Sequence, residues 1–224
     1  MTGSPLIDAA ELLRDLATRR PVFHSEADFQ FAFAWEAKST HAGLEVRLET
    51  HPEPAVRLDL ELRESGSGRG VAVEVKYMTR HWSGTVGGEG FSLKDHDATD
   101  LGGYDVIKDV QRVERFAAAR PGWSGMVIAL TNDPRYWRPP THGRSTNADA
   151  FRLGEGEILQ GERTWGPKTG GGTSRGREAA LTLSGSYKLA WADYARLDQG
   201  PGGTFRYLLI QVEGQPAAMR APRQ

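Results

Sequence analysis

The sequence predicts a mixed α/β fold in which a central mixed β-sheet is flanked by helices. Three observations lead to this prediction. Residues 55–62 and 71–77 alternate apolar and polar side chains with the two-residue period of half-buried strands. Residues 6–19 and 104–119 place apolar side chains at helical spacing. Residues 126–131 are almost continuously apolar, which is typical of a strand covered on both faces.

Composition narrows the class of protein. The chain has 224 residues, 38% of them hydrophobic and 25% charged, which suffices for one well-buried domain. A formal net charge of −1 supplies no overall positive field for a polyanion, although a local basic patch is compatible with it. The absence of cysteine excludes disulfides, thiolate zinc sites and cysteine nucleophiles. No apolar run reaches the roughly 20 residues that span a bilayer, and the first residues lack a signal-peptide pattern. We therefore expect a cytoplasmic protein with no membrane partner.

The N-terminal part of the chain predicts two helices and a short strand. The first helix covers residues 6–19 and is ended by Pro21. Ser25 is a suitable N-cap for a second, mostly buried helix that extends to residue 36. Glu26 falls in the first turn of this helix, where the helix dipole favours a carboxylate. Residues 44–49 form the expected strand.

The two alternating runs predict a β-hairpin. They are joined by residues 63–70, a segment rich in Gly and Ser that has the composition of a turn. On the second strand the valines share one face with Tyr77, so Glu74 and Lys76 share the other.

The register of this hairpin decides which acid faces Glu74. A turn centred near Gly66 and Ser67 places Asp59 opposite Glu74, whereas a shifted turn would bring Glu61 there instead. We prefer Asp59. Two acids and a lysine are then expected on one patch of the sheet.

After the hairpin, the sequence predicts further loops, helices and strands. The polar stretch 78–103 is expected to be a long loop, either functional or mobile. A strong helix and a buried strand follow, and then an irregular region. The expected elements are a helix over 104–119, strands over 126–131, 179–183 and 205–212, a short strand near 157–160 within the irregular region 141–177, and either a strand or a strand-to-helix edge over 187–194.

The chain is expected to form a single domain over residues 1–213. Its core covers about 21–131, and a strand-rich elaboration covers 132–213. Residues 214–224 are expected to be a disordered tail.

Converging carboxylates and an amine suit hydrolysis of phosphodiesters with a divalent metal ion. Asp59 and Glu74 would supply the hard oxygen ligands that Mg²⁺ prefers, and the backbone carbonyl of Val75 a third. Lys76 would orient or deprotonate the attacking water, or neutralise the non-bridging phosphate oxygens. Glu26 would complete the metal shell if the start of its helix packs against the hairpin.

Glu26, then Asp59, then Glu74-Val75-Lys76 resembles the pattern of the PD-(D/E)XK nuclease superfamily, which has the restriction-endonuclease-like fold. The resemblance covers roughly residues 21–131. It implies an αβββαβ core and a nuclease that depends on Mg²⁺ or Mn²⁺ and acts on nucleic acid, DNA rather than RNA. It also carries over Glu26, Asp59, Glu74 and Lys76 as catalytic residues.

The sequence departs from the family pattern in two places. No proline precedes Asp59, and many members lack that proline as well. The helix over 104–119 has Arg115 where the exonuclease branch has a tyrosine, so the branch of the family stays unassigned.

In the family, the helix after the third strand faces the active site, and a glutamine or basic residue there reaches the site or the phosphates. The resemblance therefore implies that Lys108, Gln111 and Arg112 contact nucleic acid. Lys94, in the preceding polar stretch, is a further candidate for a phosphate contact. Nucleases of this class that cut both strands are often dimers, so a homodimer is compatible with this hypothesis.

Other interpretations stay open. Glu74 and Lys76 could lie on a solvated strand face with a cross-strand ion pair, but Asp59 facing Glu74 would then be destabilising without a cation or proton between them. Glu26 could be only an acid favoured by its helix dipole. A second hypothesis is a catalytically inactive protein of the same fold that binds nucleic acid or another protein. A third is an unrelated α/β protein with a chance motif, which a structure with Asp59 and Glu74 on opposite faces of the sheet would establish.

Overall fold

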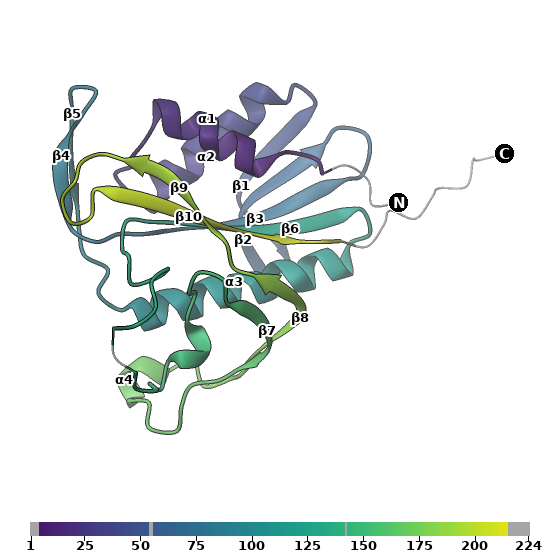
Figure 1. Ribbon diagram of the computed structural model, residues 1–224. Helices are drawn as coiled ribbons and strands as arrows, with labels where there is room; N and C mark the ends of the chain where they lie inside the picture. Colours follow the sequence, from purple (N-terminus) through teal and green to yellow (C-terminus); the bar gives the residue numbers. More distant parts are fainter. Residues whose placement is uncertain (1–4, 54–55, 142, 215–224) are drawn as a thin grey trace.

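A computed structural model describes residues 5–53, 56–141 and 143–214 (Figure 1). It has a six-stranded mixed sheet with strand order β1-β2-β3-β6-β10-β9, in which β3 and β6 are parallel and the other neighbours are antiparallel. Helices α1 and α2 cover one face and α3 covers the other (Figure 1). The predicted mixed α/β class is confirmed. The sheet strands are β1 (Leu44–Glu53), β2 (Val56–Glu64), β3 (Gly70–Met78), β6 (Trp123–Thr131), β9 (Trp191–Arg196) and β10 (Thr204–Val212).

The two N-terminal helices start at side-chain caps. Asp8 precedes α1 (Ala9–Arg19), and its carboxylate accepts a hydrogen bond from the backbone N–H of Glu11. Ser25 precedes α2 (Glu26–Thr40), and its hydroxyl accepts from the N–H of Asp28 at 3.1 Å, as its N-cap prediction requires. Helix α2 runs four residues beyond the predicted end.

The β2–β3 hairpin has the predicted register. Leu60 pairs with Val73 and Leu62 with Val71, which is the pairing of a turn centred between residues 66 and 67. Gly66 has φ 76°, in the left-handed region where glycine carries no steric cost. Ala55, predicted as the start of this hairpin, lies outside the described residues.

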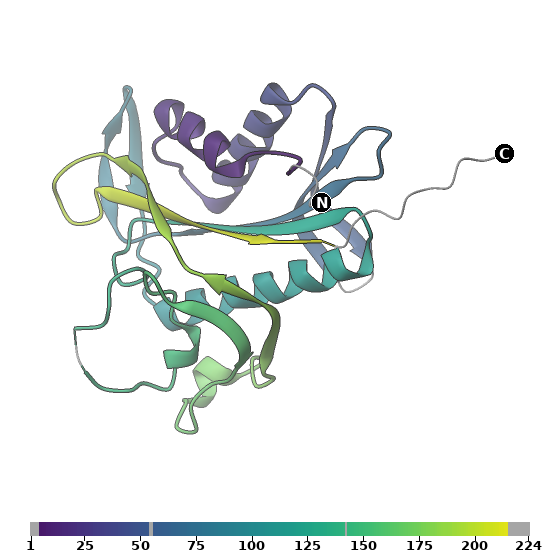
Figure 2. The ribbon, with the colours of Figure 1, turned by 45° about the vertical axis from the view of Figure 1, so that its right-hand side comes forward.

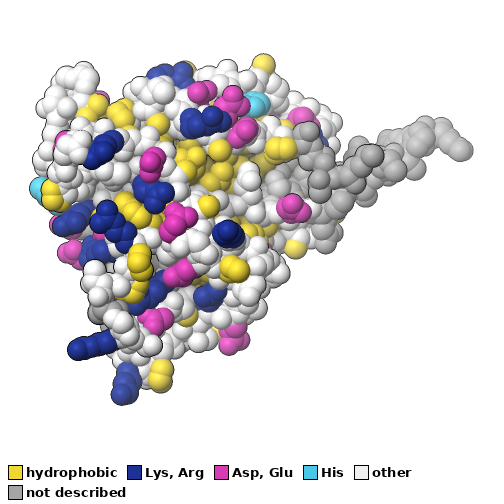
Figure 3. Space-filling model, in the orientation of Figure 1, with side chains coloured by type: hydrophobic (Ala, Val, Ile, Leu, Met, Phe, Trp, Pro, Cys, Tyr) yellow, Lys and Arg dark blue, Asp and Glu magenta, His cyan; other side chains and the backbone are white. Residues whose placement is uncertain are grey.

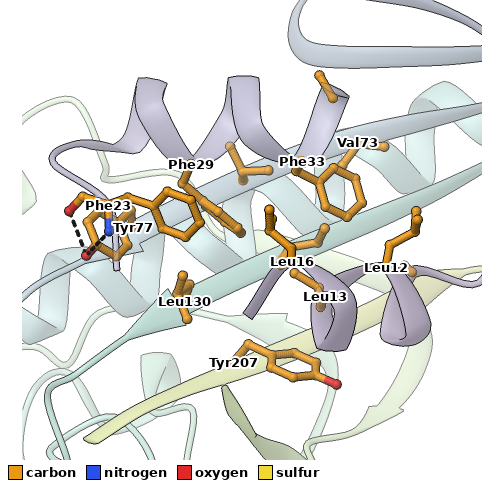
Figure 4. Packing of buried hydrophobic residues seen from close by; sticks show 14 of the residues in the cluster. Leu12, Leu13, Leu16, Phe23, Phe29, Phe33, Val73, Tyr77, Leu130 and Tyr207 are labelled. Carbon is orange, nitrogen blue, oxygen red and sulfur yellow. Dashed lines mark hydrogen bonds between the residues drawn. The ribbon is translucent and has the colours of Figure 1, made fainter. Parts of the chain in front are cut away.

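Strand β3 separates two hydrophobic clusters. Val73 and Tyr77 belong to the cluster beneath α1 and α2 (Figure 4), whereas Ala72 and Met78 belong to the cluster beneath α3. By strand alternation, the residues at 74 and 76 therefore face α3. The hydroxyl of Tyr77 donates to the carbonyl of Phe23 at 3.0 Å and accepts from its N–H at 3.3 Å, which fixes the start of α2 against β3 (Figure 4).

The stretch predicted as a long loop has regular structure instead. It contains a second hairpin, β4 (Trp82–Val86) and β5 (Glu89–Leu93), which stands beside the main sheet (Figure 1). Helix α3 (Thr99–Ala119) then begins five residues before the predicted start. Glycines interrupt the strand pattern of this hairpin, and Phe91 is one of the few apolar residues that the hairpin buries. The segment is otherwise polar, so its sequence did not predict strands.

The C-terminal part packs around α3 and the end of the sheet. Strands β7 (Ile158–Arg163) and β8 (Leu181–Lys188) form a separate two-stranded sheet on the α3 side, as the turned view in Figure 2 shows. The structure confirms the predicted strands near 157–160 and at 205–212. The strand predicted at 179–183 is β8 and lies at 181–188. The segment 187–194 is divided between the end of β8 and most of β9.

Two short helices lie in the region that was expected to be irregular. A 3₁₀ turn spans Asp149–Phe151, and α4 spans Gly171–Ser174. Of the predicted tail, only Gly214 belongs to the described residues; 215–224 lie outside them.

The described part of the chain contains no helix that is both long and apolar enough to cross a membrane. On the face seen in Figure 3, basic and acidic side chains are interspersed rather than gathered in one basic field.

Candidate active site

A pocket of about 540 Å³ opens where α2, the hairpin and α3 meet. Six carboxylates and four basic side chains line it, so its formal charge is −2 when all are ionised. All four residues predicted from the sequence as catalytic lie in it. The charged lining residues are Glu26, Glu49, Asp59, Glu74, Asp105, Asp109, Arg57, Lys76, Lys108 and Arg112.

Asp59 lies where β2 and β3 part. The last paired residues of this ladder are Leu60 and Val73, so one further step of the same register brings Asp59 beside Glu74. Instead of a ladder bond between backbones, the carboxylate of Asp59 accepts a hydrogen bond from the N–H of Val75 at 2.9 Å. One oxygen of Asp59 is thus fixed at the pocket floor. The opposite-face arrangement of a chance motif is not observed.

Glu26 reaches the pocket from the first turn of α2. Its carboxylate accepts from the N–H of Tyr77 at 2.9 Å, so the start of α2 is docked against the hairpin, as its predicted role required. Burial raises the pKa of Glu26, while Lys76 and the hydrogen bond from Tyr77 oppose the rise.

Glu74 is almost completely buried, with 1% of its side chain exposed. Arg112 Nη1 lies 2.8 Å from Glu74 Oε1. Burial raises the pKa of Glu74 to about 9; the carboxylates of Asp109 and Asp59 add to the rise, and Arg112 opposes it. The ionised form of Glu74 is therefore costly unless further positive charge is brought to it.

Lys76 is held between two oxygen acceptors. Its Nζ lies 2.8 Å from Asp109 Oδ2 and donates to the carbonyl of Val75 at 3.1 Å. Burial alone would lower the pKa of Lys76, but the carboxylates of Asp109 and Glu26 outweigh it and raise the pKa. In this arrangement Lys76 is an ammonium that donates hydrogen bonds, not a free base. The carbonyl of Val75, predicted as a metal ligand, accepts from Lys76 here.

Asp109 is the main member of the site that the sequence analysis missed. It lies on α3 with 4% of its side chain exposed, 2.8 Å from Lys76 and, through Oδ1, 2.8 Å from Arg112 Nη1. Burial raises its pKa, and the two cations oppose the rise. The available signal was the spacing of Asp105, Lys108, Asp109 and Arg112, which places all four on one face of the helix.

The structure separates the predicted nucleic-acid contacts. Lys108 and Arg112 line the pocket. The expectation for Gln111 is corrected, because Gln111 is buried against β8, where its Nε2 donates to the carbonyl of Thr182 at 3.0 Å. One residue along a helix turns the side chain by about 100°, which carries Gln111 away from the face of Arg112. Lys94 is exposed just after β5 and does not line the pocket.

Three further residues complete the wall towards β1. Gln30 Nε2 donates to Glu49 at 3.0 Å and to the carbonyl of Asp59 at 2.7 Å, which joins α2 to both strands. Arg57 Nε donates to the other oxygen of Glu49 at 2.6 Å. Glu49 has φ 52°, in the left-handed region that is uncommon outside glycine. These contacts have no signature in the sequence.

The donor chemistry of the pocket fits a hard divalent cation. Asp59, Glu74 and Glu26 provide the carboxylate oxygens that Mg²⁺ and Mn²⁺ bind. Within the described residues, the buried atoms Glu74 Oε1 and Asp109 Oδ2 have the cations of Arg112 and Lys76 beside them and no further hydrogen-bond partner. As the side chains stand, however, the described ranges contain no group of three His, Asp or Glu residues ready to hold a metal ion. Arg112 occupies the position beside Glu74 that a cation would take.

Comparison of the chain with known protein families, with curated proteins and with solved structures finds no match.

Proposed function

We propose that this protein is a metal-dependent nuclease that hydrolyses phosphodiester bonds, in DNA rather than RNA, and that it belongs to the PD-(D/E)XK superfamily. One observation carries the proposal. Glu26, Asp59, Glu74 and Lys76 come from a helix and two strands and line one pocket. The order α2-β1-β2-β3-α3-β6, with the β4–β5 hairpin inserted before α3, supports an αβββαβ core.

The carboxylates of Asp59 and Glu74 would hold Mg²⁺ or Mn²⁺, and Glu26 and the Val75 carbonyl would complete the shell. When bound, such an ion lowers the pKa of a coordinated water and stabilises charge on the phosphate. With every lining residue ionised, the formal charge of −2 would be balanced by one divalent cation. For this ion to be held, Arg112 has to leave Glu74.

The basic residues of the pocket then have separate tasks. Lys76, kept protonated by Asp109, donates a hydrogen bond to the attacking water or to a non-bridging phosphate oxygen. Arg112, released from Glu74, is positioned to pair with a phosphate through its planar fork of N–H groups. Lys108 and Arg57 are exposed near the mouth and serve contacts to flanking phosphates, which position a strand without reading its sequence.

The test is cleavage of labelled duplex, single-stranded and branched DNA by wild type and Lys76→Ala, with Mg²⁺, with Mn²⁺ and with chelator. Lys76→Ala should lose roughly 10²-fold or more of the cleavage rate while binding persists, because it removes a group that acts on the reacting atoms. Lys188→Ala, an exposed lysine on β8, is the matched control. Contaminant-free wild type that cuts none of these substrates with either metal would refute the proposal.

A second function is favoured by the ion pairs of Arg112 with Glu74 and of Lys76 with Asp109, which already partly neutralise the buried acids. It is a catalytically inactive protein of the same fold that binds nucleic acid or a protein. Titration calorimetry with Mn²⁺ separates the two: binding that Asp59→Asn weakens supports the nuclease, and its absence supports the inactive protein. For both functions we place the protein in the cytoplasm, and a homodimer is compatible with either.

A further inference from the structure

Two large aromatic side chains stand out from α2 into solvent. Trp35 is 77% exposed and Phe31 is 52% exposed, and Leu48 on β1 is 41% exposed. Together with Ile158 on β7, they are the large hydrophobic side chains that are exposed within the described residues. We call Phe31, Trp35 and Leu48 the aromatic ridge. Clustered exposed apolar residues mark interaction sites more often than isolated ones do.

On the helix, the ridge continues the wall of the pocket. Ala27 lines the pocket, and Phe31 and Trp35 follow it at four and eight residues. Residues four apart lie on nearly the same helix face, and each step advances about 6 Å along the axis. The aromatic side chains therefore extend in a row from the pocket wall along α2.

On β1, Leu48 adjoins a pocket residue in sequence. Glu49 lines the pocket and is hydrogen-bonded to Gln30 of α2, and Leu48 directly precedes it. By alternation Leu48 shares the sheet face of Val46, which packs against the cluster beneath α2. Leu48 therefore lies on the α2 side of the sheet, and the row on α2 is the part of the ridge that continues the pocket wall.

The ridge by itself is smaller than one side of a protein–protein interface. Phe and Trp side chains have at most 150–250 Å² of surface each, so the exposed part of the three side chains is roughly 400 Å² or less. A stable protein–protein interface needs about 800 Å² from each partner. Two exposed aromatic rings in a row are, however, sufficient to stack on successive bases of a single strand, because every base has a π-face.

We infer that the aromatic ridge stacks on unpaired bases of a nucleic-acid strand whose phosphate lies in the pocket. The inference rests on the proposed function and names its substrate class: single-stranded nucleic acid, or a duplex with a single-stranded segment beside the scissile bond. Bases inside an intact duplex are already stacked on one another and do not offer a free face. Arg57, whose side chain is 65% exposed at the pocket, contacts the backbone of the same strand.

The experiment measures binding, not cleavage. Fluorescence anisotropy in chelator compares wild type, Phe31→Ala/Trp35→Ala and Ile158→Ala on a labelled oligothymidylate and on a blunt duplex. The double variant should bind the single strand on the order of 10- to 100-fold more weakly. The affinity of the double variant for the duplex should be unchanged. The single variant Trp35→Phe keeps an aromatic ring and should retain much of the single-strand affinity that the double variant loses. Ile158→Ala, which truncates an equally exposed apolar residue on β7, should behave as wild type.

Equal single-strand affinity of wild type and the double variant would overturn the inference, as would a wild type that binds no single strand. Light scattering that shows a dimer dissociated by Trp35→Ala would assign the ridge to a second copy and overturn it too. The two proposals fail separately. If the double variant loses single-strand binding but the wild type cleaves nothing, only the nuclease proposal fails. If the wild type cleaves and the double variant binds as the wild type does, only the inference about the ridge fails.

Discussion

The buried carboxyl group of Glu74 should make the stability of the metal-free protein depend on pH. Burial raises its pKa to about 9 from an ordinary value of 4.5. The folded state therefore holds this proton more tightly than the unfolded state does. Its stabilising contribution is fully present below pH 4.5 and is lost as the pH rises towards 9.

The size of the effect follows from the shift. One pKa unit corresponds to about 1.4 kcal/mol, so the free energy of unfolding should fall by up to roughly 3 kcal/mol over two pH units within this window. Glu74→Gln keeps the shape of the side chain and cannot ionise, so the variant lacks this slope. Arginine stays charged throughout, so the contact with Arg112 varies with pH only through the proton on Glu74, and that variation is already part of the pKa shift.

The assay is urea unfolding in chelator at pH values of about 5.5, 6.5 and 7.5. Glu45→Gln, an exposed carboxyl on β1, is the matched control and should run parallel to wild type. The unfolding free energies of wild type and Glu74→Gln should approach each other or cross as the pH falls, and should diverge as the pH rises. Parallel curves for these two proteins would refute the assignment of a strongly raised pKa to Glu74. Mn²⁺ in place of chelator should flatten the wild-type slope, since a cation favours the ionised form.

Three further predictions concern residues of α3 and their contacts. Asp109→Ala leaves Lys76 and Arg112 without their shared carboxylate and should cost about 3 kcal/mol of unfolding free energy, measured in urea; a loss below about 1 kcal/mol, the size of a surface pair, would contradict it. Arg112→Gln removes the cation beside Glu74 and should tighten Mn²⁺ binding on the order of tenfold by calorimetry, whereas weaker binding would show that Arg112 does not compete. Gly125→Ala on β6 would place a Cβ 2.7 Å from the Cβ of Val113 on α3. The variant should therefore lose about 1–3 kcal/mol of unfolding free energy and melt at a lower temperature. An unchanged melting temperature would show that α3 can shift.

The sequence predicted the hairpin well because its register depends on local features. Alternating side chains fix which face is buried, and the turn at Gly66 fixes which residues pair. That was enough to bring Asp59 beside Glu74. The N-cap at Ser25 likewise fixed the start of α2 and hence the place of Glu26 along the chain.

The role of Asp109 could not be predicted in the same way. A charged stripe on a helix is compatible with solvent, and only the crossing of α3 over the face of β3 makes Asp109 a buried partner of Lys76. Gln111 illustrates the converse, because the β8 strand that buries it is 71 residues away in sequence. Contacts between distant segments, which no local pattern encodes, decided both residues.

The central claim is that Asp59 and Glu74 hold a divalent cation for phosphodiester hydrolysis. A crystal of the wild-type protein soaked in Mn²⁺, with anomalous diffraction data, tests it most directly. We expect a Mn²⁺ peak between the carboxylates of Asp59 and Glu74, with Arg112 moved away from Glu74. Saturating Mn²⁺ with no peak there, and Arg112 still against Glu74, would contradict the claim.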